Sequence, residues 1–392
     1  MKNTLKELKK YPIIIFFLCF LVIYSIGDCF ARAKKYDEYE NRDLAQFPKL
    51  TWEGLISNEW TQKYETYVQD QFLLRHEWIV AKSFTEGLLL RTENNNVVYG
   101  KDGYQFYKFM ELNAGTGGEG TQLAQNTAFL TQFAARHPGK INVMLVPSAS
   151  NILADKLPAG VPILDENPLM DNFFAEVSSV AEVIDVRKTF RENAEEYLYY
   201  RTDHHWTTDG AYLAYKAAAD ALETGAFDPA AHTAVEVEGF TGTNFNKSLK
   251  HNTVEDTLKY YQLDNPLTIK QLLPDGSEYS ADKGGLYDLD KLDVRDKYAM
   301  FLRGNNVYST IAGDAANGRR ILVIKDSYAN CFVPFLTADY EQIDVVDLRF
   351  WKNNVETLME LFDYDEVLVL YNFQTFTSET SLFYLNAMIT AD

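Results

Sequence analysis

The sequence predicts an α/β protein built on a parallel sheet that is flanked by helices. The first indication is a set of nearly continuous apolar runs, at residues 141–146, 321–324 and 367–370, which are typical of strands buried on both faces. The second is that such runs alternate with amphipathic segments, an order that favours parallel strands joined by helices. A hydrophobic content of 46% with only 11 prolines indicates a chain that can bury a large core and is not disordered.

The expected elements begin near residue 97 and follow one another along the chain. Strands are expected at 97–99, 104–107, 141–146, 183–186, 321–324, 343–346 and 367–370. Helices are expected over 121–136, where Pro138 and Gly139 follow as stop signals, and near 169–180. Residues 223–310 break the alternation because they are rich in Gly, Asn and Tyr. They indicate an insertion that forms part of a site or a lid over it.

The N-terminus predicts a membrane anchor or an export signal. Four lysines among the first ten residues precede 17 uncharged residues, 11–27. This length is at the short limit for a bilayer span and is long for the apolar part of a signal peptide. Three interpretations are open: an uncleaved single-pass anchor, a signal cleaved near Ala31-Arg32-Ala33, or a buried core helix. The first two place the rest of the chain outside the cytoplasm, as a protein of the cell membrane or as a secreted one.

These observations divide the chain into three parts. Residues 1–35 form a cytoplasmic basic tip and an anchor or signal segment. Residues 36–90 are charged and amphipathic, with Trp60, Tyr64 and Tyr67 at helical spacing, and predict a helical neck. Residues 91–392 form the α/β domain, which includes the insertion at about 223–310.

The charge and the cysteines exclude several classes of protein. The chain has 37 Lys and Arg against 56 Asp and Glu, a formal net charge of −19. Such a chain repels phosphate backbones, so we expect no nucleic-acid partner. The three cysteines, Cys19, Cys29 and Cys331, are too few for a disulfide framework and show no zinc-ligand spacing.

Residues 200–210 contain the densest group of reactive side chains, including two of the six histidines. In an extended segment Asp203 and His205 lie on the same side, where the carboxylate can orient the imidazole and leave its other nitrogen to act as a base. His204 and His205 can also be plain polar residues at a strand end. A metal site made of Asp203, His204 and His205 is a weaker alternative because no further ligand pattern accompanies it, and the Asp-rich motifs of Asp-His-His phosphoesterases are absent.

A base needs a nucleophile, and Ser327 is the candidate. It follows the apolar run at 321–324, so it is expected at the carboxyl end of a strand, where open α/β sheets bind their ligands. We expect a helix to begin there, with N–H groups and a dipole that favour a developing oxyanion. Alternatively, Ser327 only caps that helix. A Gly-rich match at 115–120 follows no clear strand and is interpreted as a flexible loop.

The sequence Asp203-His204-His205-Trp206 resembles the hallmark of the DHHW family of exported bacterial proteins. That family is similar to the SGNH-hydrolase-like proteins of alginate and peptidoglycan O-acetylation, in which Asp-x-His-Trp precedes an Asp-Ser turn. The resemblance extends over about residues 90–392, including 100–103, 296–298 and 347–349. It implies an SGNH-hydrolase-like fold, with Ser327 as nucleophile, His205 as base and Asp203 as its orienting partner. His204 has no catalytic role in this scheme.

The resemblance also implies an activity and its partners. We expect an extracytoplasmic O-acetyltransferase that acts on a cell-envelope or secreted polysaccharide through an acetyl-serine, with a membrane-bound O-acyltransferase as acyl donor and with no cofactor or metal. The alternatives are a carbohydrate acetylesterase and a non-catalytic polysaccharide-binding or assembly scaffold. Lys325 departs from the family pattern because SGNH proteins usually have Gly there. Asn305, Tyr328 and Arg349 are the candidates for oxyanion or substrate contacts.

Overall fold

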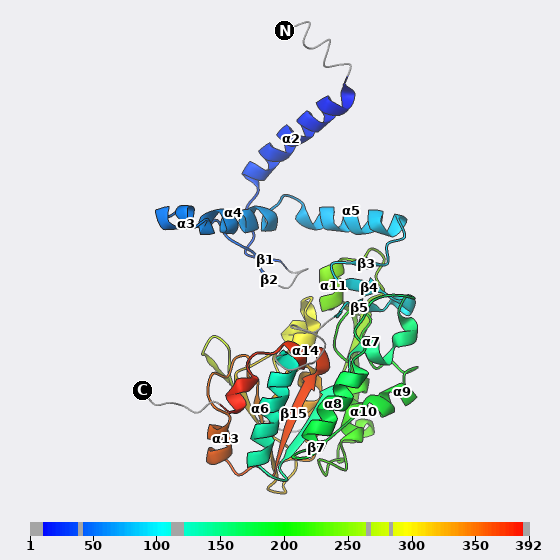
Figure 1. Ribbon diagram of the computed structural model, residues 1–392, viewed down its shortest axis with the longest axis vertical. Helices are drawn as coiled ribbons and strands as arrows, with labels where there is room; N and C mark the ends of the chain where they lie inside the picture. Colours follow the sequence, from blue (N-terminus) through cyan, green and yellow to red (C-terminus); the bar gives the residue numbers. More distant parts are fainter. Residues whose placement is uncertain (1–10, 38–41, 111–120, 264–267, 282–284, 387–392) are drawn as a thin grey trace. The chain divides into compact units, whose positions relative to one another are not determined.

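The computed structural model describes residues 11–37, 42–110, 121–263, 268–281 and 285–386 (Figure 1). The Gly-rich match at 115–120 and the N-terminal lysines therefore lie outside the described residues. The chain divides into two compact units, one made of residues 1–91 with 249–251 and the other of residues 92–248 with 252–392. Each unit is described by itself.

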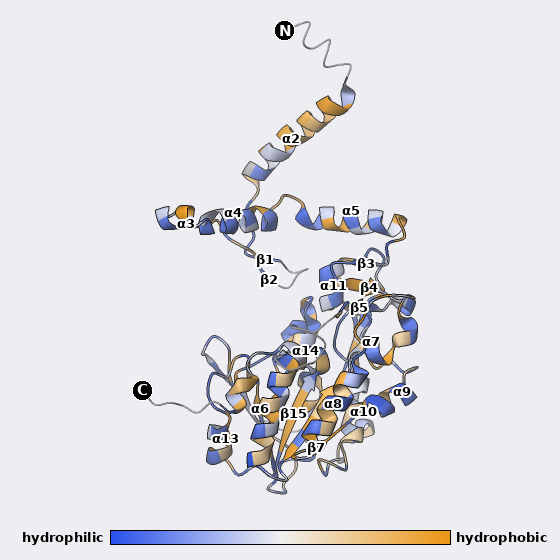
Figure 2. Cartoon of the chain, viewed as in Figure 1, coloured by the Kyte–Doolittle hydropathy of each residue, from blue (hydrophilic) through white to orange (hydrophobic). Residues whose placement is uncertain are grey.

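The first unit is mostly helical. Its elements are α2 (Pro12–Phe30), β1 (Tyr36–Asp37), β2 (Arg42–Asp43), α3 (Trp52–Ile56), α4 (Glu59–Asp70) and α5 (Arg75–Leu88). Apolar residues make up most of α2 (Figure 2). Among the residues that the structure describes, none of the helices combines the length and the apolarity that crossing a membrane requires. The anchor remains a prediction from the sequence.

The second unit contains an eight-stranded sheet of mixed direction. Its order is β11 (Glu278–Ala281), β10 (Ile269–Leu272), β12 (Tyr308–Ala312), β14 (Gln342–Val346), β13 (Arg320–Lys325), β15 (Glu366–Asn372), β6 (Ile141–Val146) and β7 (Glu182–Val183). The five strands from β14 to β7 are parallel, whereas β12, β10 and β11 are antiparallel. The expectation of an α/β fold is confirmed, but that of a purely parallel sheet is wrong. The added strands come from the end of the insertion, where β10 and β11 form a hairpin that needs no crossover helix.

Helices cover both faces of this sheet. They are α6 (Gln122–Arg136), α7 (Ala149–Ile152), α8 (Asn167–Val177), α9 (Arg187–Glu192), α10 (Thr208–Ala217), α12 (Val333–Leu336), α13 (Glu356–Leu361) and α14 (Phe373–Ser378). A further helix, α11 (Thr243–Ser248), instead packs against the strands at residues 93–107. Alternate residues of each central strand enter two separate cores, as the period of two of a strand requires. Leu322 and Ile324 pack with α6 and α8, which lie beside β15 in Figure 1, and Ile321 and Val323 pack with α10. Burial on both faces explains the continuous apolar runs.

Two smaller sheets complete the second unit. One consists of β3 (Glu93–Asn94), β4 (Val97–Tyr99) and β5 (Gln105–Tyr107), and the other of β8 (Thr233–Phe240) paired with β9 (Asp256–Gln262). In the large sheet, Ile324 is in register with Val346 of β14 and with Val369 of β15. The carboxyl ends of these parallel strands therefore meet at one edge, where Ser327 follows β13.

Candidate active site

Ser327 lies in a tight turn after β13, called here the serine turn (residues 326–331). Asp326 holds this turn, because its carboxylate accepts hydrogen bonds from the N–H groups of Tyr328 and Asn372, both at 2.8 Å. Asp326 is 1% exposed, and its burial raises the pKa of the carboxyl group, although the two N–H groups oppose that effect. Asp326 is the N-cap of the turn, so the alternative in which Ser327 is the cap is wrong.

The helix expected at Ser327 does not form. Residues 327–331 make a short 3₁₀ turn, and α12 begins only at Val333. Pro334 cannot donate a hydrogen bond, so it suits the first turn of a new helix better than the interior of a longer one. An oxyanion at Ser327 would therefore depend on individual donors rather than on a helix dipole. Over the parts of the chain that the structure describes, no acceptor takes the N–H of Ser327.

The two histidines lie in a second loop, called here the histidine loop (residues 198–207). Tyr199 and Trp206 form an isolated antiparallel bridge, and the N–H of Thr207 donates to the carbonyl oxygen of Leu198 at 2.9 Å. The chain thus turns back on itself, with residues 201–205 at the bend. The sequence analysis had expected an extended segment here, and the structure shows a bend instead. Asp203 and His205 face each other because the Asp203 carboxylate accepts the N–H of His205 across the bend, at 2.9 Å.

Hydrogen bonds join the histidine loop to the serine turn in both directions. The indole N–H of Trp206, which is fully buried, donates to the carbonyl oxygen of Tyr328 at 2.9 Å. The hydroxyl of Tyr328 in turn donates to the carbonyl oxygen of His204. Asp256, at the start of β9, accepts the N–H groups of Arg201 and Thr202 and holds the bend from the other side.

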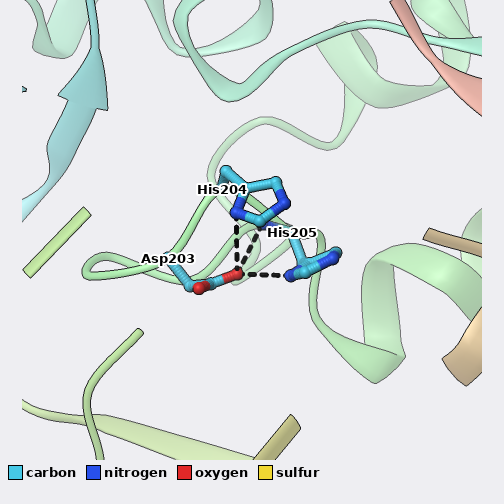
Figure 3. Close-up of side chains that lie close together, drawn as sticks. All are labelled: Asp203, His204 and His205. Carbon is cyan, nitrogen blue, oxygen red and sulfur yellow. Dashed lines mark hydrogen bonds and ion pairs between the residues drawn. The ribbon is translucent and has the colours of Figure 1, made fainter. Parts of the chain in front are cut away.

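The two loops bring Asp203, His205 and Ser327 into one chain of hydrogen bonds. Oδ1 of Asp203 lies 2.5 Å from Nδ1 of His205, and Nε2 of His205 lies 2.7 Å from Oγ of Ser327. Asp203 and His205 are 3% and 5% exposed, and Ser327 is half-buried. Figure 3 shows the Asp203 carboxylate beside both imidazole rings. The arrangement can pass a proton from Ser327 to His205 while Asp203 fixes the tautomer of the ring.

Two residues of the insertion complete the surroundings of Asp203. Oδ2 of Asp203 accepts the N–H of Thr243 at 2.6 Å and its hydroxyl at 3.0 Å. Burial disfavours the charge of Asp203, but electrostatic interactions with the imidazoles of His204 and His205, together with the hydrogen bonds from His205 and Thr243, outweigh it and hold the pKa of the carboxyl well below its usual range. Only glycine fits at position 242, because its backbone lies so close to Asp203 that a Cβ atom there would be 2.1 Å from Oδ2 of the carboxylate. Neither residue was identified from the sequence.

Lys325, where SGNH proteins usually have Gly, has a buried side chain that organises a polar cluster beside the serine turn. Its ammonium donates to Oδ1 of Asn330 at 2.6 Å and to Oδ1 of Asn305 at 3.1 Å, and it lies 3.7 Å from the Asp347 carboxylate. Burial lowers the pKa of Lys325 to about 8, with the nearby charge of Asp347 opposing that effect.

The structure places the three weaker candidates differently. Oδ1 of Asn305 accepts from Lys325 and from Asn330, so its Nδ2 group is left to donate, and no acceptor for it exists among the described residues. The Tyr328 side chain is buried and its hydroxyl is already used. Arg349 pairs with Asp347 through two hydrogen bonds, at 2.8 and 2.5 Å, and its side chain is 31% exposed. The roles of all three remain predictions.

The ligand atoms of Asp203, His204 and His205 lie within 4.8 Å of one another, which is the grouping that the sequence raised as a weaker metal site. These atoms already face hydrogen-bond partners: Asp203 and Ser327 for His205, and Thr243 for His204. The donor set is therefore better suited to proton transfer than to coordination.

Comparison with known proteins identifies the family of this chain. The sequence profile described as DHHW protein matches residues 95–346, which is more than half of the chain and contains both loops. The chain belongs to the DHHW family. The resemblance based on Asp203-His204-His205-Trp206 is thereby confirmed. No match was found among the curated proteins.

Several solved structures are similar to this chain. A DHHW family protein from Eubacterium siraeum is 21% identical with a TM-score of 0.64, and the match covers 76% of this chain and 98% of that one. PatB1 of Bacillus cereus, solved with a sulfonyl adduct, is 20% identical with a TM-score of 0.61 over 74% of this chain and 97% of that one. The O-acetyltransferase domain of Pseudomonas putida AlgJ is a more remote neighbour, at 15% identity and a TM-score of 0.44 over 73% and 93% of the two chains.

Proposed function

We propose that this DHHW protein is an O-acetyltransferase that acts outside the cytoplasm on a cell-envelope or secreted polysaccharide. The observation that carries the proposal is the continuous hydrogen-bonded chain from Asp203 through His205 to Ser327. Membership of the DHHW family supports it. The proposed acyl donor is a membrane-bound O-acyltransferase, and the N-terminal segment serves as a membrane anchor, or as a signal in a secreted form.

The first half of the reaction transfers an acetyl group to the protein. His205 Nε2 takes the proton of the Ser327 hydroxyl while Oγ attacks the acetyl carbonyl carbon of the donor. The resulting oxyanion is stabilised by the N–H of Ser327 and the Nδ2 group of Asn305, two donors for which the described residues supply no acceptor. The bond to the donor's leaving group then breaks, the leaving group takes the proton from His205, and acetyl-Ser327 remains.

The second half passes the acetyl group to a sugar. A sugar hydroxyl gives its proton to His205 Nε2 and attacks the acetyl carbon, after which the ester bond to Ser327 breaks and Oγ recovers the proton. Asp203 keeps its charge throughout and stabilises the imidazolium that forms in each half. Water in place of the sugar turns the same steps into hydrolysis, so the acceptor decides between transferase and esterase.

The test uses the full chain in detergent, treated with phenylmethylsulfonyl fluoride and analysed by peptide mass spectrometry. PatB1, which shares the fold, carries a sulfonyl adduct, so this reagent class is a suitable probe. We expect an adduct on Ser327, none in Ser327→Ala, and a retained adduct in Ser148→Ala. Ser148 is a matched control because it also follows a strand at this edge, where it contacts Glu166 instead of a histidine.

A second assay distinguishes the possible activities. With 4-nitrophenyl acetate as donor, acetylated oligosaccharide in the presence of a soluble glucan or chitin oligomer supports the transferase. Release of acetate alone, unaffected by oligosaccharide, indicates the acetylesterase. The absence of both an adduct and turnover contradicts a catalytic role and favours the non-catalytic scaffold.

A further inference from the structure

The imidazole ring of His205 is covered by another ring on each face. Tyr298 stacks on it with 3.9 Å between ring centroids and 13° between the planes, and His204 lies at 3.9 Å with a 38° tilt. Two rings this close to a third cannot share one of its faces, because their own atoms would overlap. Tyr298 and His204 therefore lie on opposite faces of His205.

Tyr298 is itself firmly held. It lies on a 3₁₀ turn of the insertion, Lys297–Met300, and is 5% exposed. Its hydroxyl donates to the carbonyl oxygen of Ser327 at 3.1 Å and lies 3.3 Å from Sγ of Cys331. Burial raises the pKa of the Tyr298 hydroxyl well above its usual value, so the group stays neutral. One side chain thus stacks on His205 and also binds the peptide of Ser327.

His204 is fixed by the residue that also fixes Asp203. Its Nδ1 atom lies 2.6 Å from the hydroxyl of Thr243, whose N–H donates to Asp203. Desolvation first, and the neighbouring charge of His205 second, lower the pKa of His204, so this ring is neutral at neutral pH. A neutral His204 can remain against His205 when the latter becomes an imidazolium, because no like charge opposes the contact.

We propose that Tyr298 and His204 are positioning residues that clamp the imidazole of His205 in the plane of its two hydrogen bonds. Bonds to Asp203 and Ser327 fix the ring within its plane, whereas the two stacked rings prevent it from rotating out of that plane. The χ2 torsion of histidine is otherwise broad, so an unclamped ring swings Nε2 away from Oγ of Ser327. The catalytic consequence of the clamp rests on the proposed function, but the clamp itself does not.

The experiment measures two quantities on the full chain. The first is the second-order rate of sulfonylation of Ser327 by phenylmethylsulfonyl fluoride. The second is the NMR shift of the His205 ring protons in histidine-labelled protein, assigned by their loss in His205→Gln. Stacked rings shift these protons upfield. Replacing a residue that has only a general structural role leaves this upfield shift unchanged.

Matched variants separate the ring from the hydroxyl. Tyr298→Leu removes the ring, and we expect sulfonylation about 100-fold slower, as for a misplaced catalytic group, with the His205 resonances moved downfield. Tyr298→Phe keeps the ring and loses one hydrogen bond, so we expect a rate within about tenfold of the wild type and resonances that stay upfield. His204→Ala and His204→Phe repeat the comparison on the opposite face of His205. Because the His204 side chain is 38% exposed, these variants keep the test available if Tyr298→Leu does not fold.

The outcomes distinguish this inference from the proposed function. Wild-type rates and unmoved resonances in Tyr298→Leu and in His204→Ala overturn the clamp. If the wild type shows upfield resonances that move in the variants, yet is not sulfonylated, then the clamp stands and the proposed nucleophile fails.

Discussion

Nε2 of His205 lies 2.7 Å from Oγ of Ser327, although the two residues are 122 positions apart in the sequence. Two hydrogen bonds hold the histidine loop against the serine turn at this contact: the Trp206 indole donates to the carbonyl oxygen of Tyr328, and the Tyr328 hydroxyl donates to the carbonyl oxygen of His204. The base and the candidate nucleophile are thus positioned by the residues that follow them in the chain. Catalytic geometry at this edge of the sheet depends on how well those two loops are held together.

Replacing Asp203 with Asn tests the orientation of His205. The nitrogen of the Asn side chain cannot accept a hydrogen bond from Nδ1–H of His205, and the neutral amide does not stabilise the imidazolium. We therefore expect a loss of about 10³–10⁴-fold in the rate of sulfonylation or acetyl transfer. Asp209→Asn is the matched control, because Asp209 lies six residues on, is 46% exposed and pairs with Lys259. Equal rates for both variants would mean that Asp203 does not orient the base.

Gly242→Ala tests the packing around Asp203 without changing any group that takes part in the chemistry. The new methyl group would lie 2.1 Å from Oδ2 of Asp203, so the carboxylate or the backbone must shift. We expect a loss of about 1–3 kcal/mol in the free energy of unfolding, together with slower sulfonylation of Ser327. Gly87→Ala is the control because its site in α5 is open, and Ala should stabilise that helix slightly. A Gly242→Ala protein with wild-type stability and rate contradicts the close approach.

Asn305 is tested as an oxyanion donor by two substitutions. Asn305→Ala removes both amide atoms, whereas Asn305→Asp retains an acceptor for Lys325 and Asn330 but removes the Nδ2 donor. Loss of one oxyanion donor costs about 10²–10³ in kcat, so we expect both variants to be slow with 4-nitrophenyl acetate. An active Asn305→Asp would show that the residue serves only to hold Lys325.

Lys325 makes stability depend on pH in the alkaline range. Its folded pKa, about 8, is below the ordinary value of 10.5, so the folded state loses the proton first as the pH rises. The cost of burying the charge is present in full below pH 8 and disappears between pH 8 and 10.5. Relative to Lys325→Met, we expect the wild type to gain about 2 kcal/mol in the free energy of unfolding between pH 7 and 10.

Denaturant titrations at pH 7 and 10 measure this difference. Lys188→Met serves as the control because the Lys188 side chain is 86% exposed, and its stability relative to the wild type should not change with pH. If the wild type and Lys325→Met differ in the free energy of unfolding by the same amount at both pH values, the lowered pKa of Lys325 is contradicted.

The sequence by itself determined the α/β class, the strands at 141–146, 321–324 and 367–370, and the family. Strands buried on both faces must be apolar at every position, so they are visible as runs in the sequence. Asp203, His205 and Ser327 could be identified because their residue types and order match a known pattern. The mixed direction of the sheet could not be predicted from the sequence, because strand pairing depends on contacts between distant segments.

Only the tertiary structure decided how the site is built around those residues. Thr243, Gly242 and Tyr298 lie in the insertion, where a hydrogen bond, a missing Cβ atom and a stacked ring leave no periodic signal in the sequence. The structure also replaced the expected helix at Ser327 with a 3₁₀ turn capped by Asp326. Two physical reasons account for these features. Thr243, Gly242 and Tyr298 act on side chains that are distant in the sequence and that only folding brings together. The turn at Ser327 depends on a choice between two neighbouring caps, Asp326 and Ser327, which the sequence alone leaves open.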